Sequence, residues 1–239
     1  MKTDPSLFVK LKMNSIVFDS LLFILFLFIF PLSVFLSLYY PNVILEQGLA
    51  HRIFYLHVSV AWVALYAPGI AAIFGILYLI QKDLKYDTIS YSMNKMALLF
   101  AFCVLFSGPI WAKSAWGVPW DWTDARLQSF FILVISLLAY FVMRTLVGDV
   151  RKKASISAFL TLISSLNSLV TWGAIRWMEN PGNHPGTVLG KGGMEPDMKL
   201  TFWINVFAFH VLFLLLFVII HRYDKTRALL EELRQTVED

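Results

Sequence analysis

Tryptophan is concentrated in one short stretch of this 239-residue chain, WAKSAWGVPWDWTDARL, which covers residues 111–127. Four of the eight tryptophans lie in its first twelve residues: Trp111, Trp116, Trp120 and Trp122. Asp124 and Arg126 follow them. Indole rings provide a flat apolar surface, and a forked guanidinium binds carboxylates in a bidentate manner. This combination predicts a site for a flat, apolar ligand that carries anionic groups.

Two histidines can supply metal chemistry for such a ligand. His57 lies where an apolar run begins, and His184 lies in the glycine- and proline-rich stretch ENPGNHPGTV. Haem iron is commonly held by histidine, and two imidazoles can fill its two axial positions. We therefore expect His57 and His184 to bind a haem that lies against the indoles. Its propionates would pair with Arg126, and Lys113 or Arg52 could act as a second partner.

These residues belong to a chain with the composition of an integral membrane protein. Of its residues 58% are hydrophobic and 15% are charged, and its mean hydropathy is +0.67, whereas about a quarter of the residues in soluble domains are charged. The net charge of +4 is therefore attributed to membrane orientation rather than to nucleic-acid binding. The single cysteine, Cys103, permits no intrachain disulfide, and the chain has no C-x-x-C-H motif for covalent haem attachment to itself.

Six segments are long and apolar enough to span a bilayer, which requires about 20 residues. They cover roughly residues 16–39, 53–80, 90–111, 128–147, 155–178 and 201–221. The first segment is about twice as long as the apolar region of a typical signal peptide and precedes no A-x-A-like site, so we expect it to be retained. The sequence predicts an all-α, six-transmembrane-helix bundle in residues 1–221, with a tryptophan-rich loop at residues 111–127, and a cytoplasmic C-terminal tail in residues 222–239.

An even number of spans places both termini on one side of the membrane, and Lys and Arg indicate which side. Fourteen of these 20 residues lie on the side of the termini, and six lie on the other: Arg52, Lys113, Arg126, Arg176, Lys191 and Lys199. Because positive residues are enriched in cytoplasmic loops, both termini are predicted to be cytoplasmic. The connections at about 40–52, 112–127 and 179–200 then face outward, so His57, His184 and the tryptophans share one face.

Three separated segments resemble one known family. WGVPWDWTDARL resembles the tryptophan-rich WWD signature of the haem-handling proteins of cytochrome c maturation, the CcmC/CcmF/CcsA superfamily. RIFYLHVSVAW at residues 52–62 and IRWMENPGNHPGTV at residues 175–188 resemble the two histidine segments of its CcmC-type haem exporter branch. The number of spans and the place of the signature between the third and fourth spans agree, so the resemblance covers nearly the whole chain.

The resemblance implies a haem-binding and haem-transfer component rather than an enzyme. Proteins of the CcmC type bind haem b at the periplasmic face of the bacterial inner membrane and present it to the haem chaperone CcmE. They work beside the ABC transporter subunits CcmA and CcmB and the small membrane protein CcmD. By position, His57 and His184 would be the haem ligands here. The matching signature residues are Trp116, Gly117, Trp120, Trp122, Asp124, Arg126 and Leu127.

The signature departs from the usual pattern at its acidic residue. Thr123 stands directly after the last tryptophan, so Asp124 is displaced by one position, and Asp121 can compensate for it. In the first histidine segment, Ser59 replaces the usual proline. These changes leave both histidines and Arg126 in place, but they leave open which role each acidic residue has.

Other interpretations remain open: the tryptophans can form an ordinary interfacial belt, and His51 is an alternative ligand, although an interfacial role is favoured for it. A CcsA-like synthase, which joins haem directly to apocytochrome thiols, shares the signature but usually has additional spans. A cytochrome b-like electron-transfer subunit would need histidine pairs deep within the spans, where only His210 lies.

We expect His210 to hydrogen-bond another helix. The candidate partners are Asn205, Asn167 and Ser164.

Overall fold

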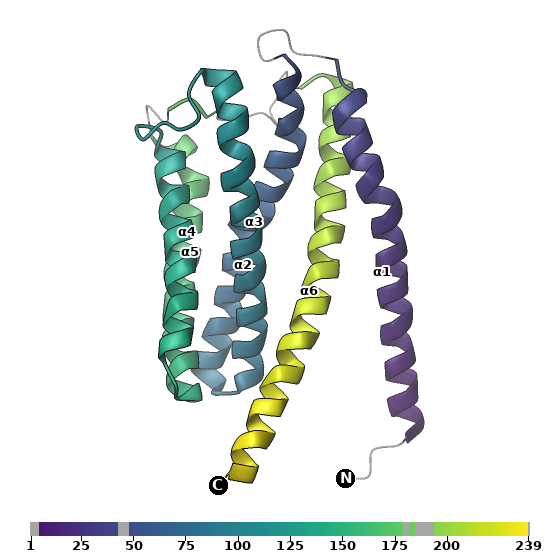
Figure 1. Ribbon diagram of the computed structural model, residues 1–239, viewed down its shortest axis with the longest axis vertical. Coiled ribbons are helices and arrows are strands. Elements are labelled where there is room, and N and C mark those ends of the chain that lie inside the picture. Colours follow the sequence, from purple (N-terminus) through teal and green to yellow (C-terminus); the bar gives the residue numbers. More distant parts are fainter. Residues whose placement is uncertain (1–4, 43–47, 179–181, 185–193, 239) are drawn as a thin grey trace.

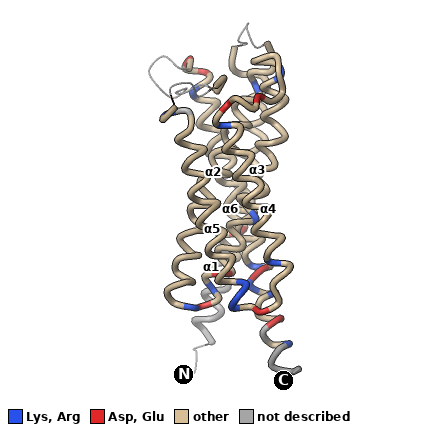
Figure 2. The backbone as a smooth tube through the Cα atoms, turned by 90° about the vertical axis from the view of Figure 1, so that its left-hand side faces the viewer, with Lys and Arg blue, Asp and Glu red and all other residues tan. Residues whose placement is uncertain are grey.

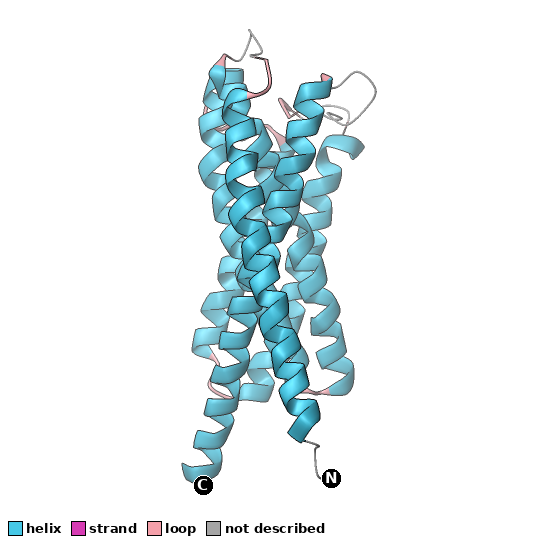
Figure 3. Ribbon diagram, turned by 90° about the vertical axis from the view of Figure 1, so that its right-hand side faces the viewer, coloured by secondary structure: helices cyan, strands magenta, loops and turns pink. Residues whose placement is uncertain are grey.

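The computed structural model describes residues 5–42, 48–178, 182–184 and 194–238. In this part of the chain the regular structure is helical throughout, without strands (Figures 1 and 3). The elements are α1 (Pro5–Tyr39), η1 (Leu49–Arg52), α2 (Ile53–Gln81), α3 (Leu84–Trp116), α4 (Ala125–Leu146), α5 (Val150–Trp177) and α6 (Pro196–Glu238), where η1 is a short 3₁₀ helix. Six of these helices are long and apolar enough to cross a membrane. The predicted all-α bundle of six transmembrane helices is therefore confirmed.

The helices run up and down, so that both termini lie at one end of the bundle, which we call the terminal end (Figure 1). Two short connections reverse the chain there. Asp83 begins α3 by accepting a hydrogen bond from the backbone N–H of Lys85, and Asp149 begins α5 by accepting one from Lys152. Aspartate is favoured at this position because its carboxylate satisfies a backbone N–H that has no partner within the helix. Helices α1, α3 and α5 end at the opposite end of the bundle, which we call the distal end (Figure 1).

Small residues let the central helices approach one another closely. Ala64, Ala67 and Ala97 are completely buried where α2 and α3 pack together. A Cβ atom at Gly75 of α2 would lie 3.4 Å from the Cα atom of Ala158 in α5. Close backbone packing of this kind favours helix association in lipid, where burial of apolar side chains supplies little driving force. Charged residues gather toward the two ends of the bundle, and uncharged residues fill most of the length between them (Figure 2).

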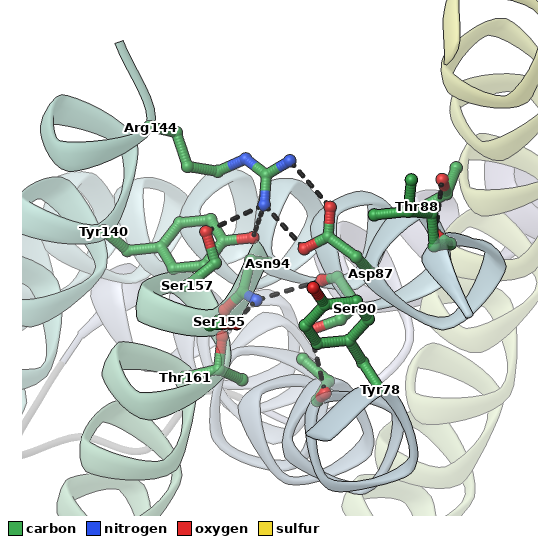
Figure 4. A network of polar contacts seen from close by, with 12 residues as sticks. Tyr78, Asp87, Thr88, Ser90, Asn94, Tyr140, Arg144, Ser155, Ser157 and Thr161 are labelled. Atoms are coloured by element: carbon green, nitrogen blue, oxygen red, sulfur yellow. Dashed lines mark hydrogen bonds and ion pairs between the residues drawn. The ribbon is translucent and has the colours of Figure 1, made fainter. Parts of the chain in front are cut away.

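A buried polar network joins α3, α4 and α5 in the half of the bundle near the terminal end (Figure 4). Arg144 of α4 binds both carboxylate oxygens of Asp87 of α3, at 2.8 and 3.0 Å, and also donates to the Ser157 hydroxyl of α5 at 2.8 Å. Nearby, the amide of Asn94 donates to the Thr161 hydroxyl at 2.9 Å. These contacts fix the relative position of the three helices that carry most of the distal site.

Candidate functional site

The tryptophan-rich stretch is partly helical, which corrects the prediction of a loop over residues 111–127. Helix α3 continues to Trp116, so that Trp111 and Trp116 project from its last turns. It ends at Gly117, whose φ of 79° is left-handed and therefore suits glycine. The Lys113 ammonium donates to the carbonyl of Gly117 at 2.7 Å and closes this helix end. Tryptophan is compatible with both a helix and a loop at a membrane interface, so the glycine was the only local signal for the boundary.

Both acidic residues of the signature have defined partners in the loop that follows. One oxygen of Asp121 accepts hydrogen bonds from the backbone N–H and the hydroxyl of Thr123, at 2.8 and 2.6 Å. The Oδ1 atom of Asp124 accepts from the backbone N–H groups of Arg126 and Leu127, both at 3.0 Å, and thereby caps α4. Thr123 is therefore accommodated by a local turn around Asp121, while Asp124 begins the helix.

The same carboxylates hold the segment that carries His184. The Oδ2 atom of Asp124 accepts from the backbone N–H groups of Asn183 and His184, at 2.9 and 3.2 Å, and His184 Nδ1 lies 3.2 Å from both carboxylate oxygens. The side-chain amide of Asn183 donates to Asp121 at 3.2 Å. Gly182 has a φ of 99°, and a Cβ atom there would lie 2.5 Å from Oδ2 of Asp124. The close approach of the two loops therefore requires glycine at this position.

The carboxylate of Asp124 is completely buried, and its hydrogen bonds favour the ionised form. Burial alone would raise the pKa of Asp124. The hydrogen bonds from His184 and from the Leu127 backbone lower it by a larger amount, so the pKa lies below the ordinary value for aspartate. An ionised carboxylate can only accept hydrogen bonds. Next to an ionised Asp124, the Nδ1 atom of His184 is therefore the hydrogen-bond donor, and in a neutral ring this leaves the lone pair on Nε2.

His57 reaches the same protonation pattern through different partners. Its ring is buried in α2, and its Nδ1 lies 2.8 Å from the Ser107 hydroxyl oxygen of α3. Ser107 donates its only hydroxyl proton to the carbonyl of Cys103, also at 2.8 Å. With the serine proton directed to that carbonyl, the serine oxygen accepts from His57 Nδ1, which in a neutral ring leaves the lone pair on Nε2. Metal-binding histidines characteristically donate their other ring N–H to a protein acceptor in this way.

A run of aromatic rings connects the two histidines. The ring centroids of His57 and Trp111 are 5.7 Å apart, those of Trp111 and Trp116 are 6.0 Å apart, and those of Trp116 and His184 are 4.9 Å apart. Glycine at position 108 leaves space for the His57 ring, because a Cβ atom at this position would lie 3.1 Å from His57 Cε1. The structure thus brings the two histidines together with Trp111 and Trp116, two of the four tryptophans of residues 111–127.

The other two tryptophans of the signature form a separate group. Trp120 and Trp122 have ring centroids 5.4 Å apart, and Trp122 packs edge-on against Phe131 of α4 at 5.3 Å. Trp122 is largely exposed, whereas the Nε1 atom of Trp120 is buried without a hydrogen-bond partner. None of their ring contacts within the described residues reaches a histidine. These two indoles therefore extend the aromatic surface over α4.

Within the described residues, Arg126 and Arg176 at the distal end form no ion pair with a carboxylate, although the charge of Asp124 acts on Arg126. The ion pairs of Lys and Arg found in the described residues are Lys85–Asp83, Lys95–Asp224, Arg144–Asp87, Arg222–Asp19 and Arg227–Glu231, all toward the terminal end. Arg126 takes part in none of them. Arg176, close enough for its charge to act on Arg126, donates instead to the carbonyl of Trp172 at 2.6 Å. This arrangement can bind an anion without breaking an existing ion pair.

Arg176, Ser107 and Gly108 were not identified from the sequence as parts of the site. The only available signal for Arg176 was its place among the few cations of the outward side, beside the second histidine segment. Ser107 and Gly108 gave no signal, because their contacts with His57 cross between two helices. The Arg52 guanidinium, considered as a second partner, has its Nε atom buried without a hydrogen-bond partner.

The two remaining histidines of interest have other environments. His51 is almost completely buried, with Nδ1 2.9 Å from the carbonyl of Gly48, and its ring contacts Tyr55 rather than an indole. His210 stacks on Tyr66 at 5.4 Å.

The predicted bond from His210 to another helix is wrong, because its Nδ1 lies 2.6 Å from the carbonyl of Val206, one turn earlier in α6. Each of its candidate partners binds elsewhere: Asn205 to Ser37, Asn167 to the Ser129 carbonyl, and Ser164 to Ser136.

The fold and the site together define a six-span helical membrane protein that brings two imidazoles together with an aromatic surface and with two arginines that form no ion pair within the described residues. The chain belongs to the CcmC family, because the family model described as "Heme exporter protein C" matches residues 2–237.

Individual relatives agree with this membership. The chain is 29% identical over 176 residues to "Heme exporter protein C" of Bradyrhizobium diazoefficiens, which covers 74% of this chain and 65% of the relative. It is 33% identical over 137 residues to "Putative cytochrome c biosynthesis ccmC-like mitochondrial protein" of Marchantia polymorpha, covering 57% of this chain and 58% of that protein. The corresponding Escherichia coli K12 protein, "Heme exporter protein C", is 28% identical over 171 residues, which cover 70% and 67% of the two chains. The matched region thus spans less than two thirds of the first two relatives.

Proposed function

We propose that this chain binds haem b at the distal end of its bundle and delivers it to the haem chaperone CcmE during cytochrome c maturation. The observation that carries the proposal is the pair of imidazoles, His57 and His184. The Nδ1 atom of each ring lies at hydrogen-bonding distance from a protein oxygen, 2.8 Å from that of Ser107 for His57 and 3.2 Å from that of Asp124 for His184, so Nε2 would be the atom that binds iron. Family membership supports the identity of the ligand, since the relatives are named as heme exporters.

The residues of the distal site fit haem in each of its chemical parts. Haem iron takes up two axial nitrogen ligands, which His57 and His184 would supply through Nε2. Trp111 and Trp116 would contact the apolar macrocycle. Arg126, which has no carboxylate partner among the described residues, would pair with a propionate.

In this proposal Arg176 is the second cation for the propionates, in preference to Lys113 and Arg52. The Lys113 ammonium is already bonded to the carbonyl of Gly117. Arg176 carries its charge close to Arg126 and is exposed at the end of α5.

The proposal also includes the membrane orientation and the partners. The distal end would face the periplasm, and both termini would lie in the cytoplasm of a bacterium whose inner membrane holds the protein. The excess of Lys and Arg on the side of the termini supports this orientation. The partners would be the ABC transporter subunits CcmA and CcmB, the small protein CcmD and the surrounding lipid bilayer, with no nucleic acid. The chain would hold and release haem without making a covalent bond to it.

The absorbance spectrum of the purified protein tests the proposal. Wild-type protein loaded with haem should show the spectrum of iron with two histidine ligands. The double variant His57→Ala/His184→Ala should lose this spectrum and most of its bound haem while still inserting into the membrane. His210→Phe is the matched control, because His210 lies in a span and stacks on Tyr66 without contacting the site. Unchanged haem content in the double variant would refute the ligand assignment.

A further inference from the structure

We propose that Asp124 is the positioning residue that holds His184 in the geometry for binding iron. This inference rests on the proposed function, because it assigns a role to Asp124 toward the same haem. It also gives a role to Asp124, the aspartate that is displaced by one position in the signature. The argument depends on how differently the two histidines are anchored.

Among the described residues, Asp124 is the carboxylate that bonds to His184 itself, while Asp121 bonds to the side chain of the preceding Asn183. The backbone N–H of His184, its Nδ1 atom and the backbone N–H of Asn183 all bond to Asp124. It lies between helices, so no helical hydrogen bonds fix its backbone. The only ring contact of its imidazole in the described part of the chain is with Trp116, at 4.9 Å.

His57, by contrast, is fixed by several independent features. It lies within α2, which holds its backbone, and its ring is bonded to Ser107 and packed against Trp111. The backbone of Gly108 approaches it closely on α3. Removal of any one of these contacts leaves the others in place. The two ligands should therefore respond unequally when a single hydrogen-bond acceptor is lost.

The two oxygens of Asp124 accept different backbone hydrogen bonds, so a substitution can remove one set of bonds and keep the other. Oδ1 caps α4, whereas Oδ2 accepts the two backbone N–H groups of the His184 segment. In Asp124→Asn the amide oxygen can still cap the helix, because asparagine is as good a cap as aspartate. The amide nitrogen cannot accept a hydrogen bond, so the two backbone bonds from Asn183 and His184 and the contact of the imidazole with Oδ2 are lost, and the imidazole keeps only its contact with the capping oxygen.

The experiment compares Asp124→Asn with Asp149→Asn in haem-loaded full-length protein. Asp149 caps α5 at the terminal end through the same chemistry, so it controls for the cap and for the lost charge. We expect Asp124→Asn to raise the dissociation constant for haem about 10- to 100-fold, the usual effect of removing the acceptor behind a metal-bound histidine. Its spectrum should become that of His184→Ala and not that of His57→Ala. Asp149→Asn should match the wild type.

A second variant approaches the same contact from the opposite side. Gly182→Ala places a Cβ atom 2.5 Å from Oδ2 of Asp124 and in an unfavourable backbone conformation. It should therefore reproduce the spectrum of Asp124→Asn. The matched control is Gly148→Ala, where nothing lies within 4 Å of the added atom. In haem-free protein, both site variants should also accelerate hydrogen–deuterium exchange at the Asn183 and His184 amides.

The outcomes separate the two proposals. Wild-type affinity and a wild-type spectrum in both Asp124→Asn and Gly182→Ala would overturn the role of Asp124 while leaving haem binding intact. Equal weakening in Asp149→Asn would also overturn it, because the effect would then reflect the stability of the bundle. A wild-type protein that binds no haem would instead refute the proposed function. Amide exchange at Asn183 and His184 would still report whether Asp124 holds that segment.

Discussion

Replacement of the two distal arginines should weaken binding of haem but not of haem whose propionates are esterified. The variants are Arg126→Gln, Arg176→Gln and the double variant. Neither arginine forms an ion pair within the described residues, so neither substitution leaves a carboxylate without its partner. Any loss of affinity therefore reports contacts with the ligand.

The size of the loss follows from the burial of each side chain. A hydrogen bond to a charged group contributes about 1.5 to 3 kcal/mol, which corresponds to about a 10- to 150-fold change in Kd. Arg126 is half-buried at the start of α4 and should lie toward the upper part of this range. Arg176 is exposed and already stacks on Trp172 at 4.2 Å, so its contribution should be about tenfold or less.

The assay is a haem titration in detergent, followed by the quenching of tryptophan fluorescence and by the haem absorbance. Haem and haem dimethyl ester are compared for each variant, because the ester keeps the iron and the macrocycle but removes both negative charges. Lys113→Gln is the matched control, since its ammonium already bonds to the Gly117 carbonyl. An equal loss of affinity for haem and for the ester, or no loss for either, would refute the assignment of these arginines to the propionates.

Three further predictions concern the bundle, the first histidine and the alternative function. Asp87→Ala should lower the free energy of unfolding by about 3 to 5 kcal/mol, because it leaves the charge of Arg144 buried without its partner. The double variant Asp87→Ala/Arg144→Leu should recover most of this loss. Reversible unfolding in mixed micelles, followed by circular dichroism, measures the stability of both variants. Gly108→Ala should weaken haem binding by crowding His57, whereas Gly148→Ala should not, and a similar haem affinity in the two variants would contradict this. Co-expression with an apocytochrome in cells that lack CcmE should give no covalent haem, and a covalent product would instead favour the CcsA-like synthase.

The membrane architecture was predictable from the sequence because it depends on the length of apolar runs. Six runs of sufficient length predicted six helices, and the structure contains them. The helix ends were predicted less well. The segment from Trp111 to Trp116 was assigned to a loop although it belongs to α3, since only Gly117 marks its end locally. Apolarity identifies the part of a helix that lipid surrounds, but it carries little information about how far the helix extends beyond it.

The contacts that define the distal site were not predictable, because they join distant parts of the chain. Asp124 and His184 are separated by 60 positions in the sequence. The sequence placed both at one face through topology, yet it could not show that the carboxylate bonds to the imidazole. It also gave no reason to prefer Ser107 over other serines as the partner of His57, which lies 50 residues away. Topology can assign residues to one end of a bundle, whereas their pairing depends on helix rotation and on loop conformation.

The ion pairs of the structure distinguish positive side chains that have a carboxylate partner from those that have none, which a count of charges in the sequence cannot do. The number of Lys and Arg residues on each side predicts the membrane orientation. In that count, the six positive residues of the distal side matter only because they are fewer than those on the other side. In the structure the described cations toward the terminal end include five with carboxylate partners, as at Lys95–Asp224 and Arg222–Asp19. At the distal end, Asp121 and Asp124 are occupied by backbone groups and by the His184 segment, and are therefore not paired with Arg126. Arg126 and Arg176 thus form no ion pair within the described residues, because the carboxylates nearby are already used to build the site.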